Sequence, residues 1–228
     1  MTKGEKGKVK VLKDGKLKIF KAVKGLVRDG KIASKLIKAE RPEVVALGLA
    51  PEELDGLRTL LDEGGEYEPD LSNIDMAYVE HLAEYGDVEA PPPCFTKSLK
   101  AADRLGIDVV ALDIDISSHT DIYVQNVLFS DLLRQSMKFR YIKKKKFKIR
   151  TAEDFALQWD AILNKAEGFS IVESAREDCM AEALRGLLEK YNNIVAIIEI
   201  ERSDGVVERL LRPKKTKKGK KRAKKGKK

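Results

Sequence analysis

The sequence contains few of the residues on which most enzyme classes depend. It has two histidines, His81 and His119, and two cysteines, Cys94 and Cys179, in 228 residues. Neither cysteine belongs to a CxxC pair or a Cys/His cluster with zinc-site spacing, so we expect two buried free thiols, with a disulfide as the alternative. The patterns GxGxxG, GxxxxGK[ST], GxSxG and HExxH are absent, and we expect no cofactor and no metal site of a common type.

Long apolar runs are also missing. No stretch approaches the ~20 apolar residues of a membrane-spanning helix, and the first ten residues, MTKGEKGKVK, lack the apolar region of a signal peptide. We therefore expect a cytoplasmic protein without a membrane span. Charged residues make up 36% of the chain and aromatic residues 6%, a composition compatible with the surface ion pairs of thermophile proteins.

The net charge of +8 is unevenly distributed along the chain. Residues 212–228 hold 12 of the 45 lysines and arginines and no acid, which leaves 33 basic against 37 acidic residues in 1–211. The sequence thus predicts a mildly acidic domain, 1–211, followed by a disordered, lysine-rich tail that contacts a polyanion, RNA or DNA first of all. The predicted contact residues of the tail are Lys214, Lys215, Lys217, Lys218, Lys220, Lys221, Arg222, Lys224 and Lys225.

Strand and helix patterns alternate through the domain. Residues 8–23 alternate in polarity around Asp14-Gly15, which is typical of a β-hairpin. A continuous apolar run at 44–49 is typical of a buried parallel strand, and the mainly apolar segments 107–114 and 194–200 are predicted to be two more. The fold class we predict is α/β: a mainly parallel sheet with helices on both faces and an N-terminal hairpin. Helices are expected at 31–40, 51–61, 74–85, 96–105, 120–139, 151–167 and 171–190, and a short strand or helix at 206–211.

One polar cluster follows a predicted buried strand. Asp113, Asp115 and His119 lie at the carboxyl end of the run 107–114, where α/β sheets commonly place their ligands. Two carboxylates and an imidazole can hold a divalent cation or perform acid–base chemistry, and Arg176, if it faces the same cleft, would favour an anion. The alternative is structural, with Asp115 capping the helix that follows.

A second basic segment precedes the helix predicted at 151–167. Its residues Lys143, Lys144, Lys145, Lys146, Lys148 and Arg150 lie close to the aromatic residues Phe139, Tyr141 and Phe147. Such a mixture can bind phosphates and stack on bases. A solvated linker whose aromatic side chains pack into the core is an equally good interpretation.

Four segments, in order, resemble the TraB/PrgY family, whose relatives include the TIKI metalloproteases. The residues that carry the resemblance are KIASKLIKAERPEVVALGLAPEELDGL (31–57), ALDIDISSHT (111–120), SAREDCMAEAL (174–184) and IVAIIEIERSDGV (194–206). They are similar to the family's "rPdvVavEL", "aiDrdi..T", "ERDxyMaxxL" and "vVavVGxGHxxGi". The resemblance implies an α/β fold.

The departures from the family fall on the positions that its relatives use for metal binding and catalysis. The first-strand GxxH has no histidine here, the two family glutamates fall on Gly48 and Ala175, and the histidine of GxGH falls on Arg202, whereas Arg176 matches. Without those imidazoles and carboxylates, the family's type of metal site is not expected.

Three functional hypotheses follow. The first is a non-catalytic TraB-like binding or scaffolding protein whose tail contacts nucleic acid or ribosomal surfaces. The second is a divergent, possibly metal-dependent hydrolase that uses Asp113, Asp115, His119 and Arg176. The third is electrostatic attachment of the tail to an anionic membrane. A homo-oligomer is compatible with each of them.

Overall fold

The computed structural model describes residues 7–64, 71–147 and 149–212. A five-stranded sheet in the order β1-β2-β5-β3-β4 forms the centre of the molecule, and all its neighbouring strands are parallel except β1 and β2. The strands are β1 (Val9–Leu12), β2 (Leu17–Ala22), β3 (Val44–Leu47), β4 (Asp108–Ala111) and β5 (Ile194–Glu199). The predicted α/β class and N-terminal hairpin are therefore confirmed.

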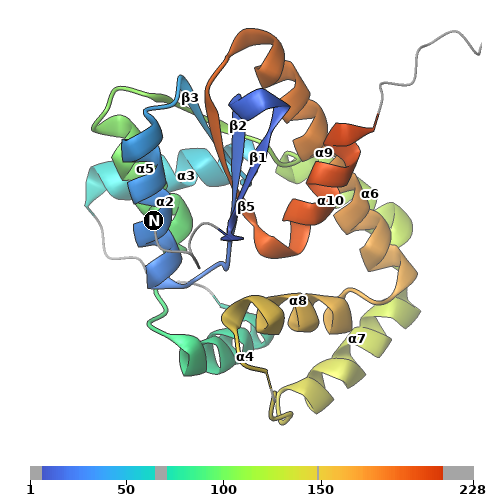
Figure 1. The fold of residues 1–228 in the computed structure, drawn as a ribbon. Helices are drawn as coiled ribbons and strands as arrows, with labels where there is room; N and C mark the ends of the chain where they lie inside the picture. Colours follow the sequence, from blue (N-terminus) through green and yellow to red (C-terminus); the bar gives the residue numbers. More distant parts are fainter. Residues whose placement is uncertain (1–6, 65–70, 148, 213–228) are drawn as a thin grey trace, which may run out of the picture.

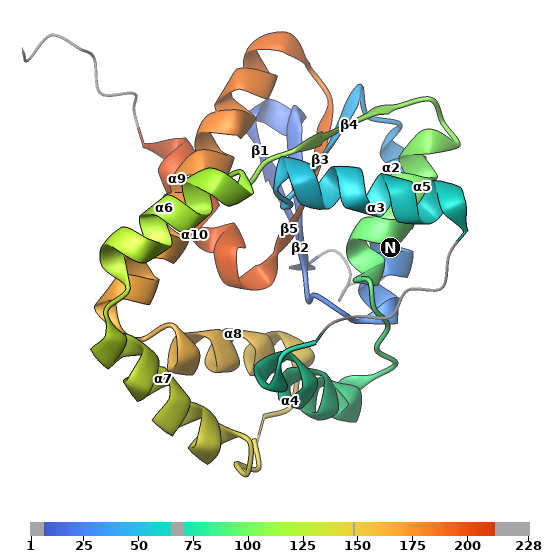
Figure 2. The same ribbon diagram turned by 180° about the vertical axis from the view of Figure 1, so that it is seen from behind.

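Helices connect the strands and cover the sheet. Their bounds are α2 (Val27–Glu40), α3 (Pro51–Glu63), α4 (Asn73–Leu82), α5 (Pro93–Asp103), α6 (Ile116–Asn126), α7 (Phe129–Ile142), α8 (Ala152–Leu163), α9 (Glu167–Lys190) and α10 (Ile200–Leu211), with short 3-10 turns η1 (Lys13–Gly15) and η2 (Ala83–Tyr85). Figure 1 shows α2, α3 and α5 on one side of the sheet and α9 and α10 on the other. Figure 2 shows the same arrangement from behind.

Alternate residues of the buried strands face opposite layers of helices. Phe20, Val45 and Ile197 belong to the hydrophobic cluster with α2, α3 and α5. Ile19 and Ala196 belong to the cluster with α9 and α10. Because side chains along a strand point alternately to the two faces, a run of consecutive apolar residues is what a sheet covered on both faces requires.

The first helical layer is packed closely enough to require a glycine. An added Cβ on Gly30 of α2 would lie 2.4 Å from the carbonyl oxygen of Pro93. Any side chain here would thus separate α2 from the first turn of α5. This contact fixes α2 beside α5. Only four residues, 23–26, separate the end of β2 from the start of α2.

A third layer lies across the carboxyl ends of the parallel strands. Helices α4 and α8 pack together there around Phe155 and Trp159, with Leu82 and Phe147 in the same cluster. Figures 1 and 2 both place α4, α7 and α8 beneath this edge of the sheet. The carboxyl ends of the strands therefore face a helical layer.

The prediction of a single helix at 120–139 is wrong, because this segment forms two helices, α6 and α7. Val127 and Leu128 are extended, and the carboxylate of Asp131 accepts a hydrogen bond from the Leu128 N–H at 3.3 Å. An added Cβ on Gly168 of α9 would lie 2.5 Å from the Asn126 carbonyl oxygen. Leu128 is 64% exposed and Leu132 40% exposed, so the apolar periodicity that predicted one long helix does not mark a core face.

Several other expectations are settled by the structure. Residues 206–211 are the end of a longer helix, α10, that starts directly after β5. Both cysteines are free; Cys94 is buried, as expected, whereas Cys179 is only partly buried. Within the described residues, no helix is long and apolar enough to cross a membrane. The predicted tail contacts from Lys214 onward, and Lys148, lie outside the described residues.

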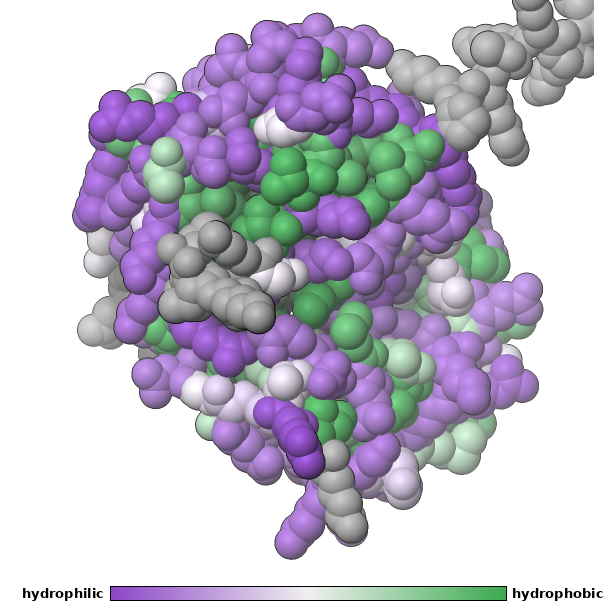
Figure 3. All heavy atoms as spheres, in the orientation of Figure 1, coloured by the Kyte–Doolittle hydropathy of each residue, from purple (hydrophilic) through white to green (hydrophobic). Residues whose placement is uncertain are grey.

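The surface of the molecule is mostly hydrophilic. In Figure 3 apolar side chains gather over the β1 edge of the sheet and the nearby helices. Val11 in β1 is 54% exposed and Leu211 in α10 is 55% exposed. An edge strand with apolar side chains can pair with another strand, and the prediction of a homo-oligomer stays a prediction.

Candidate functional site

The largest described cavity lies between the carboxyl edge of the sheet and the helical layer beneath it. Its volume is about 960 Å³, compared with about 490 and 340 Å³ for two others. Ligands of parallel α/β sheets bind at this edge. The polar side chains of the wall are Lys24, Glu53, Thr59, Glu63, Asp75, Tyr78, Glu89, Gln135, Asp160, Asn164, Glu173, Arg176, Glu199, Glu201 and Arg202.

Arg176 holds one side of the site through three carboxylates. Its Nη2 lies 2.6 Å from Asp113 Oδ2 and 3.6 Å from Glu199 Oε2, and its Nη1 lies 2.9 Å from Glu173 Oε2. Glu173 and Arg176 are three positions apart on α9 and so share a face. The arginine therefore faces the cavity with its charge already matched by the protein.

Glu199 ends β5 and brings a second cation into the same network. Its Oε1 lies 3.2 Å from Lys24 Nζ, just beyond β2. Burial alone would raise the pKa of Glu199, but the charges of Lys24 and Arg176 outweigh it and lower that pKa to about 2. The same ion pair raises the pKa of Lys24. Glu199 is thus a carboxylate at every physiological pH.

Arg202 is the most buried cation of the site, with 7% of its side chain exposed. It pairs with Asp160 of α8, with Glu177 of α9 at 3.3 Å, and, through Nε, with Glu173 at 3.3 Å. This arginine joins α8, α9 and α10 beneath the sheet. Nearby, an added Cβ on Gly205 would lie 2.1 Å from a Glu177 oxygen, so glycine lets α10 approach α9 this closely.

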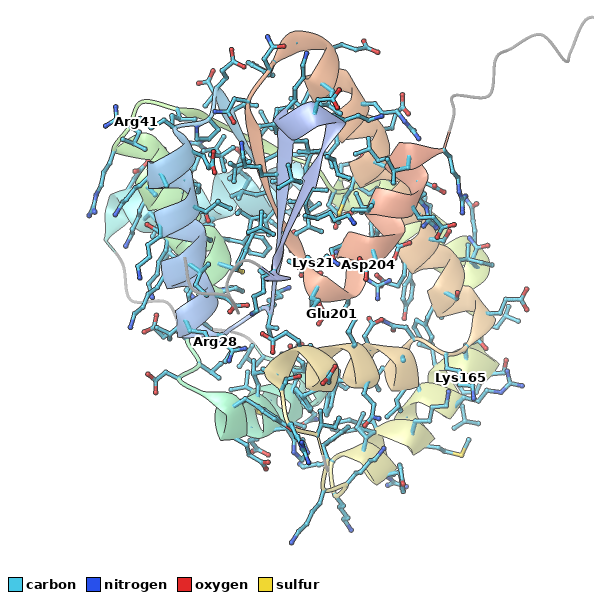
Figure 4. The ribbon with its side chains drawn as sticks, viewed as in Figure 1. Lys21, Arg28, Arg41, Lys165, Glu201 and Asp204 are labelled. Carbon is cyan, nitrogen blue, oxygen red and sulfur yellow. The ribbon has the colours of Figure 1, made fainter. Side chains whose placement is uncertain are left out.

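Glu201 differs from these groups in having no cationic contact of its own. Burial, followed by the charge of Glu199, raises the pKa of Glu201 to about 8. Its buried Oε2 lacks a hydrogen-bond partner, and so does the buried hydroxyl oxygen of Tyr78. Figure 4 places Glu201 in the first turn of α10, between the end of the sheet and α8.

Aromatic and aliphatic side chains form the rest of the wall. The rings of Tyr78 and Trp159 meet edge to face with their centroids 5.6 Å apart. Burial, followed by the charges of Glu201 and Glu199, raises the pKa of the Tyr78 phenol. The other apolar wall residues include Leu49, Leu57, Leu60, Ile74, Val79, Val88, Pro91, Phe95 and Leu163.

The structure separates three of the residues predicted to act together. Asp113 lies behind Arg176 and accepts its Nε–H at 2.9 Å. Because β4 ends at Ala111, Asp113 and Asp115 do not lie on a continuing strand. Asp115 instead accepts the Ser118 N–H at 2.8 Å and caps α6, and the ring of His119 stacks on that of Tyr123.

The basic segment divides its aromatic residues between the core and the surface. Phe147 is buried against Phe155, and Tyr141 is 65% exposed. The Lys145 ammonium lies 5.1 Å from the centre of the Phe147 ring and 6.0 Å from that of Tyr141. The exposed basic residues are Lys143, Lys144, Lys146 and Arg150. Of the two interpretations, core packing holds for Phe147, and only Tyr141 is left as an exposed ring for base stacking.

Glu199, Glu201 and Tyr78 were not among the residues predicted to carry chemistry. A signal for the two glutamates does exist, because the sequence EIE directly follows the buried run IVAII and so lies at the carboxyl edge of a parallel sheet. Tyr78 has no such signal. It reaches the site from α4, through the packing of α4 on α8.

Two of the four positions that the family resemblance draws together line the cavity. Arg176 and Arg202 belong to its wall, but Gly48 and Ala175 do not. Among the described residues, no three His, Cys, Asp or Glu side chains form a group that could hold a metal ion. No family model matches the chain, and no curated protein matches it either.

Proposed function

We propose that the protein is a non-catalytic, TraB-like binding protein whose C-terminal polycation contacts RNA or DNA. The observation that carries this proposal is the separation of charge: 12 basic residues and no acid in 212–228, after a domain in which acids outnumber bases. A polycation attracts nucleic acid by releasing counterions, without reading its sequence. The domain, with 33 basic against 37 acidic residues in 1–211, adds no net attraction of this kind.

The arginines of the cavity support the non-catalytic part of the proposal. Arg202 stands where the resembling family has a histidine, and it is paired with Asp160, Glu173 and Glu177. A guanidinium does not ligate a metal ion and is not deprotonated in a protein. The hydrolase alternative requires Asp113, Asp115 and His119 to act together, and none of these three lines the cavity.

A salt titration tests the polyanion contact. Full-length protein and a full-length variant whose tail lysines and arginines are all glutamine are titrated with a labelled 20-nucleotide RNA and a 20-base-pair DNA. We expect wild-type affinity to fall about a thousandfold between 50 and 200 mM salt, and the variant to bind weakly with a shallow salt dependence. Equal binding by the two proteins would reject the tail as the contact.

A second variant separates the tail from the basic segment. Replacement of Lys143, Lys144 and Lys146 by glutamine removes three exposed charges and leaves the tail intact. We expect a smaller loss of affinity, with a salt slope reduced by about 3. Sedimentation with vesicles of anionic lipid at physiological salt tests the membrane alternative, and binding to vesicles in preference to RNA and DNA would overturn the proposal.

A further inference from the structure

Two of the buried polar atoms without a hydrogen-bond partner in the described residues belong to side chains of the cavity wall. Three buried side-chain atoms in the described residues lack a hydrogen-bond partner: Tyr78 Oη, Glu201 Oε2 and Asn193 Oδ1. The first two line the cavity; Asn193 precedes β5 and lies at the opposite edge of the sheet. Because a buried polar atom without a hydrogen-bond partner is unfavourable, a ligand that supplies partners to Tyr78 and Glu201 gains affinity from both.

The charges of the cavity wall exclude an anionic ligand. The described cavity wall has eight carboxyl groups and three cations. All three cations are already paired: Lys24 with Glu199, Arg176 with Asp113, and Arg202 with Asp160. No cation is left to receive an acid or a phosphate, whereas Glu201 has an oxygen free to accept a hydrogen bond.

The groups that face Glu201 come from every neighbouring element. Glu199 approaches from β5, Asp160 from α8 and Tyr78 from α4, while Arg202, on α10 itself, opposes them. The anionic neighbours and the burial favour a proton on Glu201 near neutral pH. An ammonium group can take the place of that proton, since it neutralises the same carboxylate and in addition donates hydrogen bonds.

The remaining wall suits the other parts of such a ligand. Tyr78 and Trp159 supply aromatic rings to the wall, and aromatic rings attract cations through their quadrupoles. Beyond them, apolar side chains such as Leu57, Ile74 and Leu163 line a volume that is at the upper end of small-molecule sites. A ligand with an ammonium end and a hydrocarbon body therefore matches both halves of the cavity.

We infer that this cavity binds an organic amine, with the ammonium group on Glu201, a hydrogen bond to the Tyr78 hydroxyl oxygen, and the hydrocarbon part along the aliphatic wall. This amine site belongs to the domain and does not involve the polycationic tail. It assigns the cavity a ligand class and leaves the proposal about nucleic acid unchanged.

Three probes of similar size test the ligand class. Hexylamine, 1-hexanol and hexanoate are titrated into the full-length protein by calorimetry at pH 6.5, 7.5 and 8.5, in two buffers of different ionisation enthalpy. We expect hexylamine to bind more tightly than either other probe, with release of close to one proton at pH 6.5. Its affinity should rise about tenfold or more between pH 6.5 and 8.5, because fewer sites then hold the competing proton.

Two variants separate a charge contact from simple hydrophobic uptake. Glu201→Gln keeps the shape and hydrogen-bonding capacity of the protonated side chain. It should lower the affinity for hexylamine at least tenfold and abolish the release of a proton on binding. Glu80→Gln, at an exposed position of α4 outside the cavity wall, should leave the hexylamine affinity and the proton release unchanged. Equal affinity for hexylamine and 1-hexanol, tighter binding of hexanoate, or wild-type hexylamine binding without proton release would each overturn the inference.

Discussion

Arg202 and Glu201 are neighbours in the sequence, yet their environments in the structure are opposite. Arg202 is buried among Asp160, Glu173 and Glu177, so its charge is more than balanced. Glu201 is buried with no cation of its own and one oxygen without a partner. In the first case the protein has satisfied its buried charge internally. In the second case the protein leaves a carboxyl oxygen unpaired, and a proton or a ligand can pair with it.

Within one cavity, the Arg202 network therefore contributes to stability, whereas Glu201 is suited to binding a ligand. A buried ion network of fixed geometry holds α8, α9 and α10 together, and such networks have little capacity left for a ligand. A buried carboxyl without a partner costs stability, and groups of that kind are common at binding and catalytic sites. We therefore expect substitutions in the network to affect folding and substitutions at Glu201 to affect binding.

The largest effect should come from Arg202→Met. This change keeps much of the side-chain volume but leaves Asp160, Glu173 and Glu177 close together without their shared cation. Removal of one partner from a buried ion pair typically costs about 3–5 kcal/mol, so the free energy of unfolding in urea should fall by that order. Arg212→Met is the matched control. Arg212 is 60% exposed and pairs with Glu208, and its loss should leave the stability almost unchanged, as for exposed surface pairs in general. Equal effects of the two substitutions would mean that the Arg202 network contributes no more than a surface pair.

A smaller effect, with a distinct pH dependence, is expected for Glu199→Gln. The folded protein lowers the pKa of Glu199 from 4.5 to about 2, so its ionised form stabilises the fold above pH 4.5. That contribution is lost as the pH falls from about 4.5 to about 2. The variant should therefore be less stable than wild type by about 2–3 kcal/mol at pH 7, and the two should converge toward pH 2. Urea titrations at pH 3, 5 and 7 measure the gap; a gap that stays constant with pH would contradict the ion-pair explanation.

The sequence predicts the sheet well because each buried strand is marked by an apolar run within its own few residues. The runs VVALGL and IVAII contain no charged or polar side chain, a pattern typical of strands covered on both faces. The same reasoning fails at 120–139. There, apolar residues recur at helical spacing although Leu128 is 64% exposed, and periodicity cannot tell a core face from an exposed one.

The site was less predictable than the fold for a related reason. Arg176 was identified as a residue facing a cleft, and the structure places it in the cavity wall. Its partner Asp113 was identified too, but as a reacting group and not as the counter-ion. Tyr78 is separated from Glu201 by more than a hundred positions in the chain, and only the packing of α4 against α8 brings them to one cavity. No local pattern encodes such a contact.

Glu201→Gln should change the stability in the opposite direction. Because the folded protein raises the pKa of Glu201 from 4.5 to about 8, the folded state holds a proton that the unfolded chain releases. Wild-type stability therefore decreases relative to the variant as the pH rises from about 4.5 to about 8. We expect the two proteins to be equally stable at pH 4 and the variant to be more stable by about 4 kcal/mol at pH 8, measured by urea unfolding. A saturating amine should reduce this difference, since it stabilises only the wild type through Glu201. If the variant were instead less stable at pH 8, Glu201 would have a stabilising partner when ionised, and the contrast with Arg202 would disappear.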